Sequence, residues 1–243
     1  MIPVQFHKGY LWIEVAALGS DKLLHFVVDS GAASSVLNLR TARRLGLELG
    51  KAEAVQGVSG PGTAYHVAHF KAQTAGTSLP DSLLALDFRS FGITPGRPVD
   101  GLLGADFFRG RIVQIDYAAG KIFLLDKANP DSRYDELPIR TCNECLCVPL
   151  KIAGKSQQWM RLDTGCDSAL EWFAGDAPAA GATHYVPTNV QIGGTQLIGI
   201  ETGIHARRLF PGEAGLVGNE LLSKFKVTID GKNNKLFLER KGI

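Results

Sequence analysis

The 243-residue sequence has no block of like charge, and its net charge is only +2 at pH 7. Clustered basic residues are what nucleic acids and anionic membrane surfaces attract, so we expect neither as a partner. No apolar run reaches the ~18 residues that a membrane-spanning helix needs. The first residues, Met-Ile-Pro-Val-Gln, lack the pattern of a signal peptide. The compartment is left open, export to the periplasm included.

Motifs of several other chemistries are also missing. The six histidines contain no His-Glu-x-x-His pattern, so we expect no metal site from them. Residues 57–61 approach a nucleophile elbow, but Pro61 stands at the last glycine position. Residues 149–156 end like a phosphate-binding loop, but Pro149 replaces the first glycine. We therefore expect no cofactor.

Cysteine is scarce, and three of the four cysteines fall within six positions, at Cys142, Cys145 and Cys147. A zinc site would need a fourth ligand, and Cys166 is the remaining cysteine. The alternatives are a local disulfide in an oxidising compartment or free thiols in a reducing one. We favour these alternatives over zinc and leave the choice between them open.

Glycine, in contrast, is abundant, at 28 residues. As a share of the 243 residues (28/243) this exceeds the average glycine content of about 7%. It favours a β protein with many turns over a helical one. The apolar content of 45% supports a large core. The length fits one large β domain or two small ones.

One short motif occurs twice in the chain. Each copy is an apolar run followed by an acid, a hydroxyl residue and a glycine. The copies are Asp29-Ser30-Gly31 and Asp163-Thr164-Gly165. Two such turns in one chain indicate two carboxylates that meet.

Physical chemistry gives a reason for that meeting. A buried strand through Phe26 to Val28 delivers Asp29 to a partly desolvated place, where a lone carboxylate is costly. Two carboxylates about 3 Å apart cannot both ionise, and sharing one proton lowers the cost. The glycines allow the two turns to approach closely. The hydroxyls of Ser30 and Thr164 are placed to hydrogen-bond across the junction.

The residues after the first motif predict a helix and a mobile hairpin. Asn38 is a candidate N-cap for a short helix that ends at Gly46. Residues 56–65 contain three glycines and one proline, and glycine-rich loops are often functional. We interpret this segment as a flap over a substrate, with an ordinary surface turn as the alternative. The flap candidates are Gly57, Val58, Ser59, Gly60 and Tyr65.

A second pattern is also duplicated. Residues 101–124 align without a gap on residues 215–238, at a constant offset of 114 (215 − 101). Each copy contains Gly-Leu-[Leu/Val]-Gly, then a predicted short helix, then a closing hairpin. The two helices are expected at Ala105–Phe108 and Asn219–Leu222. Together with the paired acidic turns, the pattern indicates an internal duplication.

With these motifs, both halves of the chain resemble the retropepsin-like aspartic proteases. The whole chain resembles bacterial aspartyl proteases that carry two such lobes. The resemblance implies an all-β fold, mainly strands with a few short helices, in the two-lobed pepsin/retropepsin-like arrangement about a pseudo-twofold axis. We expect lobes at residues 1–126 and 147–243, joined by a connection at residues 127–146.

The second copy departs from the family pattern. Cys166 stands where alanine is usual, and Asp167 adds an acid that would perturb the pair if it pointed inward. The distance from the aspartate to the last glycine of the second motif is 75 residues in the first half (104 − 29) and 55 in the second (218 − 163). The second lobe is therefore expected to be shorter. Residues 190–197 are either a second flap or a plain hairpin with a Gly-Gly turn.

The resemblance implies an aspartic endopeptidase that binds an extended polypeptide between its lobes. One carboxylate of the Asp29/Asp163 pair would take a proton from water while the other protonates the peptide carbonyl, without a metal or a covalent intermediate. Which aspartate carries the proton is left open. Because one chain holds both motifs, we expect a monomer. The alternative is a peptide-binding protein of the same fold that is non-catalytic, or that processes only itself or a single partner.

Overall fold

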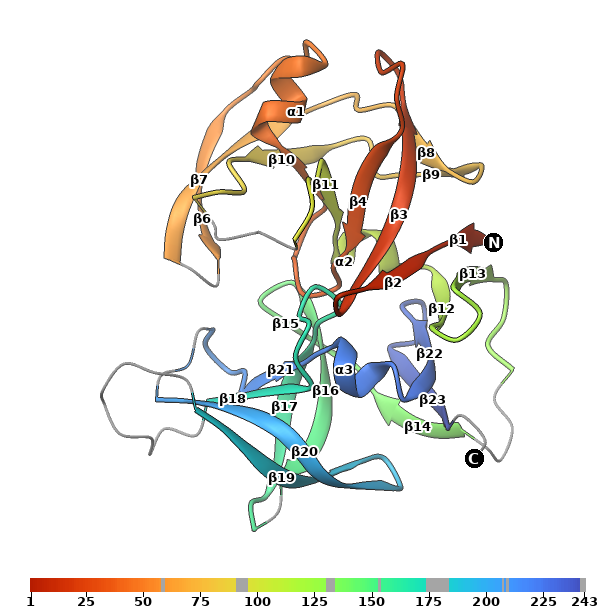
Figure 1. The fold of residues 1–243 in the computed structure, drawn as a ribbon, viewed down its shortest axis with the longest axis vertical. Helices are drawn as coiled ribbons and strands as arrows, with labels where there is room; N and C mark the ends of the chain where they lie inside the picture. The colour runs from red at the N-terminus through yellow and green to blue at the C-terminus, as the bar shows by residue number, and fades with distance from the viewer. Residues whose placement is uncertain are drawn as a thin grey trace.

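The computed structural model describes residues 1–57, 60–90, 96–129, 134–152, 154–173, 184–206, 208 and 210–240. Within these residues the chain forms three β-sheets and three short helices (Figure 1). One sheet lies in each half of the molecule, and the third lies at one side and joins them. The all-β prediction is confirmed. No helix in this part of the chain is long and apolar enough to cross a membrane.

The first half of the chain forms a ten-stranded sheet at the top of Figure 1. The strand that ends before Asp29 is β4, which pairs antiparallel with β3 and parallel with β11. The buried strand predicted to deliver Asp29 is therefore present, in a hairpin with β3. The strands are β2 Gln5–His7, β3 Tyr10–Ala17, β4 Leu24–Val28, β5 Val36–Asn38, β6 Ala52–Gly57, β7 Gly60–Val67, β8 Ala72–Thr74, β9 Thr77–Ser78, β10 Leu83–Leu86 and β11 Gly101–Leu103.

The predicted helix after the first motif is confirmed as α1, Leu39–Arg44. The side chain of Asn38 accepts a hydrogen bond from the N–H of Arg40 at 3.1 Å, which satisfies one of the unpaired donors at the start of the helix. Gly46 follows with a positive φ of 66°, a conformation that favours glycine after a helix end.

The second half forms a seven-stranded sheet at the bottom of Figure 1. Strand β17 ends before Asp163 and pairs with β16 and, in parallel, with β21. Its surroundings therefore repeat those of β4. The strands are β15 Arg140–Cys142, β16 Cys145–Ile152, β17 Gln157–Leu162, β18 Leu170–Phe173, β19 His184–Ile192, β20 Thr195–His205 and β21 Gly215–Val217.

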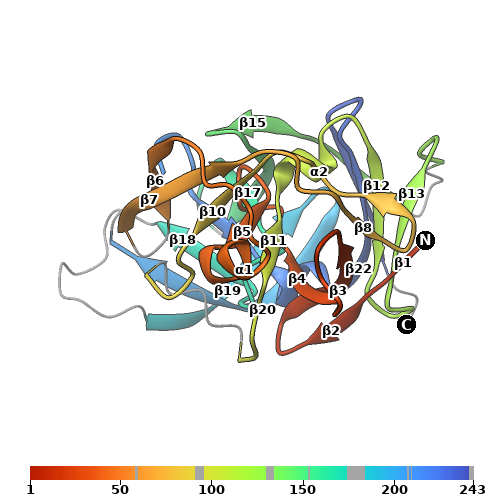
Figure 2. The same cartoon turned by 90° about the horizontal axis from the view of Figure 1, so that it is seen from above.

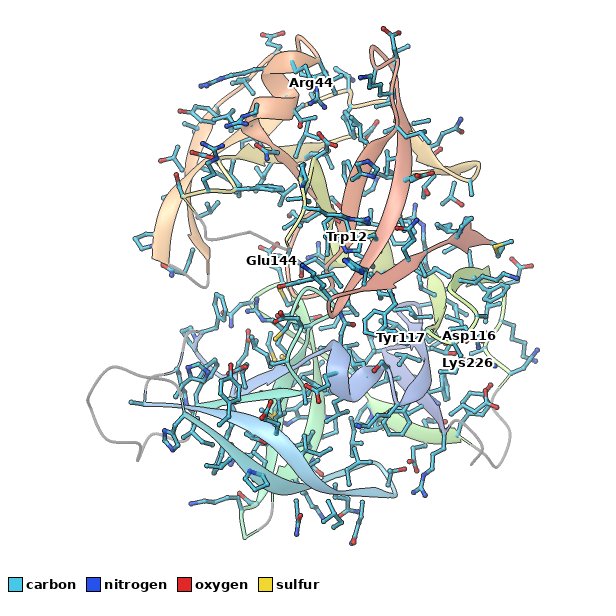
Figure 3. The ribbon with its side chains drawn as sticks, viewed as in Figure 1. Trp12, Arg44, Asp116, Tyr117, Glu144 and Lys226 are labelled. Atoms are coloured by element: carbon cyan, nitrogen blue, oxygen red, sulfur yellow. The ribbon has the colours of Figure 1, made fainter. Side chains whose placement is uncertain are left out.

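The third sheet has six strands and draws on both halves. It lies opposite the β6–β7 hairpin in both views (Figures 1 and 2). Figure 3 labels Asp116 and Lys226 in it, whose charged atoms are 3.6 Å apart on β12 and β22. The strands are β1 Ile2–Pro3, β12 Ile112–Asp116, β13 Lys121–Leu125, β14 Tyr134–Pro138, β22 Phe225–Asp230 and β23 Lys235–Arg240.

Repeated sequence corresponds to repeated structure. The predicted short helices are α2, Ala105–Phe108, and α3, Asn219–Leu222. Strands β12 and β22 pair antiparallel with Gln114 opposite Thr228, two residues separated by the sequence offset of 114. Their side chains are hydrogen-bonded at 3.0 Å. Residues related by the repeat thus face each other at a local twofold axis, while the duplication itself stays a prediction.

The domain boundaries also stay a prediction. Within the predicted connection, β14 pairs with β23 and β15 pairs with β16, so both strands take part in sheets. Residues 190–197 form the end of the β19–β20 hairpin, where the N–H of Gly194 donates to Asp135 of β14 at 2.9 Å. The structure therefore supports the plain hairpin over a second flap for these residues.

Candidate active site

The two aspartates occupy equivalent positions. Asp29 follows β4, and its N–H donates to the carbonyl of Leu103 in β11 at 2.9 Å. Asp163 follows β17, and its N–H donates to the carbonyl of Val217 in β21 at 3.0 Å. In each half the Gly-Leu-[Leu/Val]-Gly strand thus fixes the point at which the chain turns.

The backbone of each turn folds back onto its own carboxyl group. The N–H groups of Gly31 and Ala32 both donate to Oδ1 of Asp29 at 3.0 Å. The N–H of Gly165 donates to Oδ1 of Asp163 at 2.9 Å. Hydrogen bonds to an ionised carboxyl favour that form, so the two turns support their acids unequally.

Ser30 and Thr164 lock the turns together with reciprocal hydrogen bonds, as predicted. The N–H of Ser30 donates to Oγ1 of Thr164 at 2.9 Å, and the N–H of Thr164 donates to Oγ of Ser30 at 3.1 Å. Each hydroxyl also donates to the opposite strand, from Ser30 to the carbonyl of Leu162 at 2.7 Å and from Thr164 to that of Val28 at 2.9 Å. Both side chains are fully buried.

Ser30→Ala is expected to lower the free energy of unfolding by about 2–4 kcal/mol. It leaves the buried N–H of Thr164 and the buried carbonyl of Leu162 without these partners, and each such loss costs about 1–3 kcal/mol. Urea unfolding at fixed pH measures the change. Ser90→Ala, which removes an exposed hydroxyl bonded to Asp87, is the control and should stay within about 0.5 kcal/mol of wild type. Equal values for the two variants would contradict the role of the lock.

The two carboxyl groups meet at this junction, each against the glycine of the opposite turn. A methyl group on Gly31 would lie 2.3 Å from the carboxyl carbon of Asp163, and one on Gly165 would lie 2.3 Å from that of Asp29. Each glycine is therefore required because the carboxyl group of the other half lies against it. The sequence prediction that these acids come together agrees with this geometry.

The environment raises the pKa of both acids. Burial, followed by repulsion from Asp163, raises the pKa of Asp29 to about 8, although the two turn amides act in the opposite direction. Burial also raises the pKa of Asp163, and the positive charge of Arg161 acts against this. A pair of carboxyls in such surroundings holds a proton that an isolated acid would lose.

Sequence reasoning missed the buried ion pair of Arg161 and Glu213. Arg161 lies on β17 two residues before Asp163, and its Nε and Nη2 donate to the carboxylate of Glu213, both at 2.7 Å. A comparison of the two motif copies contained the signal, because Met-Arg-Leu-Asp stands where the first copy has Phe-Val-Val-Asp. Glu213 carries no such signal, since it lies in a loop far along the chain.

A cleft of about 810 Å³ opens beside the two aspartates. The first half lines it with apolar side chains: Val27, Val36, Val55, Leu84, Leu86 and Leu102. The second half contributes both kinds. Its polar and charged side chains are Asn143, Arg161, Asp167, Glu171, Tyr185 and His205, and its apolar ones are Phe173, Phe210, Pro211 and Leu216. The carboxyl of Asp167 lies near the hydroxyl of Tyr10, and its charge helps to raise the pKa of Tyr10.

The flap candidates are only partly in contact with the cleft. Gly57 lines it at the end of β6. Gly60 begins β7 with a φ of 128°. Tyr65 lies further along β7, outside the residues that line the cleft. Val58 and Ser59 lie outside the described residues.

All four cysteines are free thiols in this structure. The thiol of Cys145 donates to the carbonyl of Gly31 at 3.2 Å, and burial raises its pKa to about 12. Cys166 lines the cleft, contacts Oγ of Ser168 at 3.1 Å and also has its pKa raised to about 12 by burial. Among the described residues, no group of three or more His, Cys, Asp or Glu side chains is arranged to hold a metal ion.

The fold is that of the pepsin-like aspartic proteinases, and the paired carboxyls lie where its two halves meet. The crystal structure of an aspartic proteinase from Irpex lacteus superposes with a TM-score of 0.65 over 99% of this chain and 97% of that one, at 14% sequence identity. The sequence profile of the aspartyl protease family matches residues 15–107. A search of curated proteins found no match. The predicted two-lobed pepsin-like fold and the resemblance to the retropepsin- and pepsin-like aspartic proteases are therefore confirmed, and both support an aspartic protease.

Proposed function

We propose that this protein is an aspartic endopeptidase in which Asp29 and Asp163 jointly activate a water molecule. The observation that carries the proposal is the contact of the two carboxyl groups, each held against the glycine of the opposite turn. The family profile covers the turn of Asp29 but ends before that of Asp163. The role of Asp163 therefore rests on geometry.

The reaction requires one ionised and one protonated carboxyl group. The ionised group takes a proton from water as the oxygen attacks the peptide carbonyl, and the protonated group donates its proton to the carbonyl oxygen. The tetrahedral intermediate then breaks down as the first group returns its proton to the leaving nitrogen and the second group recovers a proton from a hydroxyl of the intermediate. The pair ends with the same number of protons, so no metal or cofactor enters the proposal. The locked turns hold both carboxyls in place without reorganisation.

The substrate that we propose is an extended polypeptide. The cleft volume fits a few side chains, and the β6–β7 hairpin stands beside it with Gly57 in its lining. We propose this hairpin as the lid, and residues 1–126 and 147–243 as the two lobes. The mainly apolar wall of the first lobe and the mixed polar and apolar wall of the second are expected to contact different substrate side chains.

The alternative is a peptide-binding protein of the same fold without general proteolytic activity, or with activity toward itself or one partner. Both aspartates, both glycines and both hydroxyls of the site are present, which favours hydrolysis. Incubation with a random peptide library between pH 3 and pH 8, followed by mass spectrometry, tests the proposal. New termini that a statine-type transition-state mimic suppresses are the expected result. Binding of peptides without any cleavage would favour the alternative.

One chain is expected to be sufficient for activity. Because the chain carries both aspartates, the rate per molecule should not change on serial dilution of the protein. A site built from two chains would lose activity in proportion to the loss of dimer. The measurement is initial rate against protein concentration, with sedimentation analysis at the same concentrations. A rate per molecule that falls with dilution would contradict the single-chain site.

A further inference from the structure

Arg161 makes contacts that reach across the junction between the two halves. Arg161 is buried, with 5% of its surface exposed, and its carboxylate partner Glu213 is 0% exposed. The remaining donor, Nη1, contacts the carbonyl of Gly31 at 2.7 Å. The planar group also lies over the ring of Phe210, with Cζ 3.8 Å from the ring centre. Arg161 is therefore fixed in one orientation next to both acidic turns.

The first half has no cation at the equivalent position. The position equivalent to Arg161 is occupied by Val27, which lies two residues before Asp29. The bidentate pair with Glu213 forms a dipole whose positive end donates to the carbonyl of Gly31, and Gly31 lies against the carboxyl of Asp163. The site is thus electrically asymmetric although its backbone is nearly symmetric.

The backbone alone favours the opposite asymmetry. Asp29 accepts two turn N–H groups and Asp163 accepts one, so hydrogen bonds by themselves would make Asp29 the stronger acid. Both bonds to Asp29 end on Oδ1, which leaves Oδ2 available to carry a proton. The charge of Arg161 therefore has to outweigh one hydrogen bond.

We propose that Arg161, held by Glu213, is a positioning residue that keeps Asp163 ionised and leaves the shared proton on Asp29. The inference rests on the proposed function and assigns the two roles within it. Asp163 takes the proton of the attacking water, and Asp29 protonates the carbonyl oxygen from Oδ2. In the second half of the reaction, Asp163 protonates the leaving nitrogen and Asp29 recovers its proton from the intermediate.

The other titratable groups around the pair are Tyr10 from β3, Cys145 from β16, and Cys166 and Asp167 from the second turn. Burial raises the pKa values of Tyr10, Cys145 and Cys166, so these groups are neutral near pH 7. The carboxyl of Asp167 lies near Tyr10.

The test removes the charges of the pair while keeping its hydrogen-bonding groups. Arg161→Gln alone would leave Glu213 buried without a counter-charge, which endangers folding, so the main variant is Arg161→Gln/Glu213→Gln. Arg161→Lys keeps the positive charge and serves as the rescue variant. Arg109→Gln is the matched control, because Arg109 donates to the carbonyls of Ala33 and Glu144 beside the first turn rather than to the pair (Figure 3 labels Glu144). Near-ultraviolet circular dichroism verifies the fold of each variant.

The measurement is a carboxyl ¹³C NMR titration of protein with ¹³Cγ-labelled aspartate, with signals assigned through Asp29→Asn and Asp163→Asn. In wild type, in Arg109→Gln and in Arg161→Lys, the Asp163 signal should titrate at the lower pH. In the double variant its midpoint should rise by about one pH unit, since a nearby opposite charge shifts a carboxyl by about 1–3 units and Glu213 offsets part of this. The acid limb of kcat/KM should move by the same amount.

Two results would overturn the inference. One is a wild-type titration in which Asp29 ionises first. The other is a double variant whose Asp163 midpoint does not move although the charge has been removed. If the double variant does not fold, an Arg161→Lys variant in which Asp29 ionises first would overturn the inference instead. The titration does not require turnover. A wild-type protein that cleaves no peptide would therefore contradict the proposed function, but it would not decide which aspartate carries the shared proton.

Discussion

Asp29→Asn and Asp163→Asn are each expected to lower kcat/KM by about 10⁴-fold or more. An amide can neither take a proton from water nor donate one from the position that the reaction needs. Each variant should be nearly as inactive as the Asp29→Asn/Asp163→Asn double variant, because groups that act as one unit show strongly non-additive losses. Initial rates on a peptide found in the library digest provide the measurement.

The matched control is Asp81→Asn. Asp81 is an exposed aspartate outside the cleft, whose carboxylate is 3.4 Å from Nζ of Lys71, so its loss should leave the rate unchanged. Substantial activity in Asp163→Asn would make the second half a structural partner only. The working site would then have to be sought in a dimer of first halves, which the dilution experiment would detect independently.

The parts of the fold that the sequence predicted are those set by local patterns. An apolar run that ends in Asp-[Ser/Thr]-Gly specifies a buried strand and a tight turn, and Asn38 before an arginine-rich stretch specifies a capped helix. The gapless repeat at an offset of 114 predicted α2 and α3 with their correct bounds. In each case the decisive contacts lie within a few residues or within one repeat.

The parts that the sequence did not predict depend on distant pairings. Glu213 meets Arg161 from 52 residues away, and Asn143 also donates to it from 70 residues away at 2.7 Å. No local pattern marks these three residues as neighbours. The strand β14 likewise joins the third sheet through the C-terminal β23. Pairings of this kind are fixed only when the whole chain folds, so the Arg161–Glu213 pair beside the cleft became visible only in the structure.

Asp29 is also expected to make the protein less stable as the pH rises from about 4 to about 8. Its pKa is about 8 in the folded chain, whereas an aspartate in an unfolded chain has a pKa of about 3.9. Between these values the folded state binds more protons than the unfolded state, so the free energy of unfolding falls with pH. Below about pH 4 both states are protonated and the stability contribution is complete. It is lost progressively as the pH rises through the folded pKa.

Asp29→Asn should remove this penalty because an amide does not titrate. Relative to wild type, the free energy of unfolding of the variant should rise by on the order of 3 kcal/mol between pH 4 and pH 8. Each unit of pKa difference is worth about 1.4 kcal/mol, and we expect about half of the full difference because the two acids share one proton. Urea unfolding at half-unit pH intervals measures the difference. An inactive variant that is more stable at pH 8 would show that the site holds its carboxyls at a cost to the fold.

Asp100→Asn provides a control of opposite sign. Burial alone would raise the pKa of Asp100, but hydrogen bonds from Thr41, from the N–H of His25 and from Arg44, together with the charge of Arg44, lower it. Figure 3 labels Arg44, whose Nη2 is 2.8 Å from the carboxylate. This acid stabilises the fold above its unfolded pKa and loses that contribution as the pH falls, so Asp100→Asn should be less stable than wild type at pH 7 and approach it near pH 3. If Asp29→Asn instead ran parallel to wild type from pH 4 to pH 8, the raised pKa of Asp29 would be wrong, and with it the assignment of the shared proton to that residue.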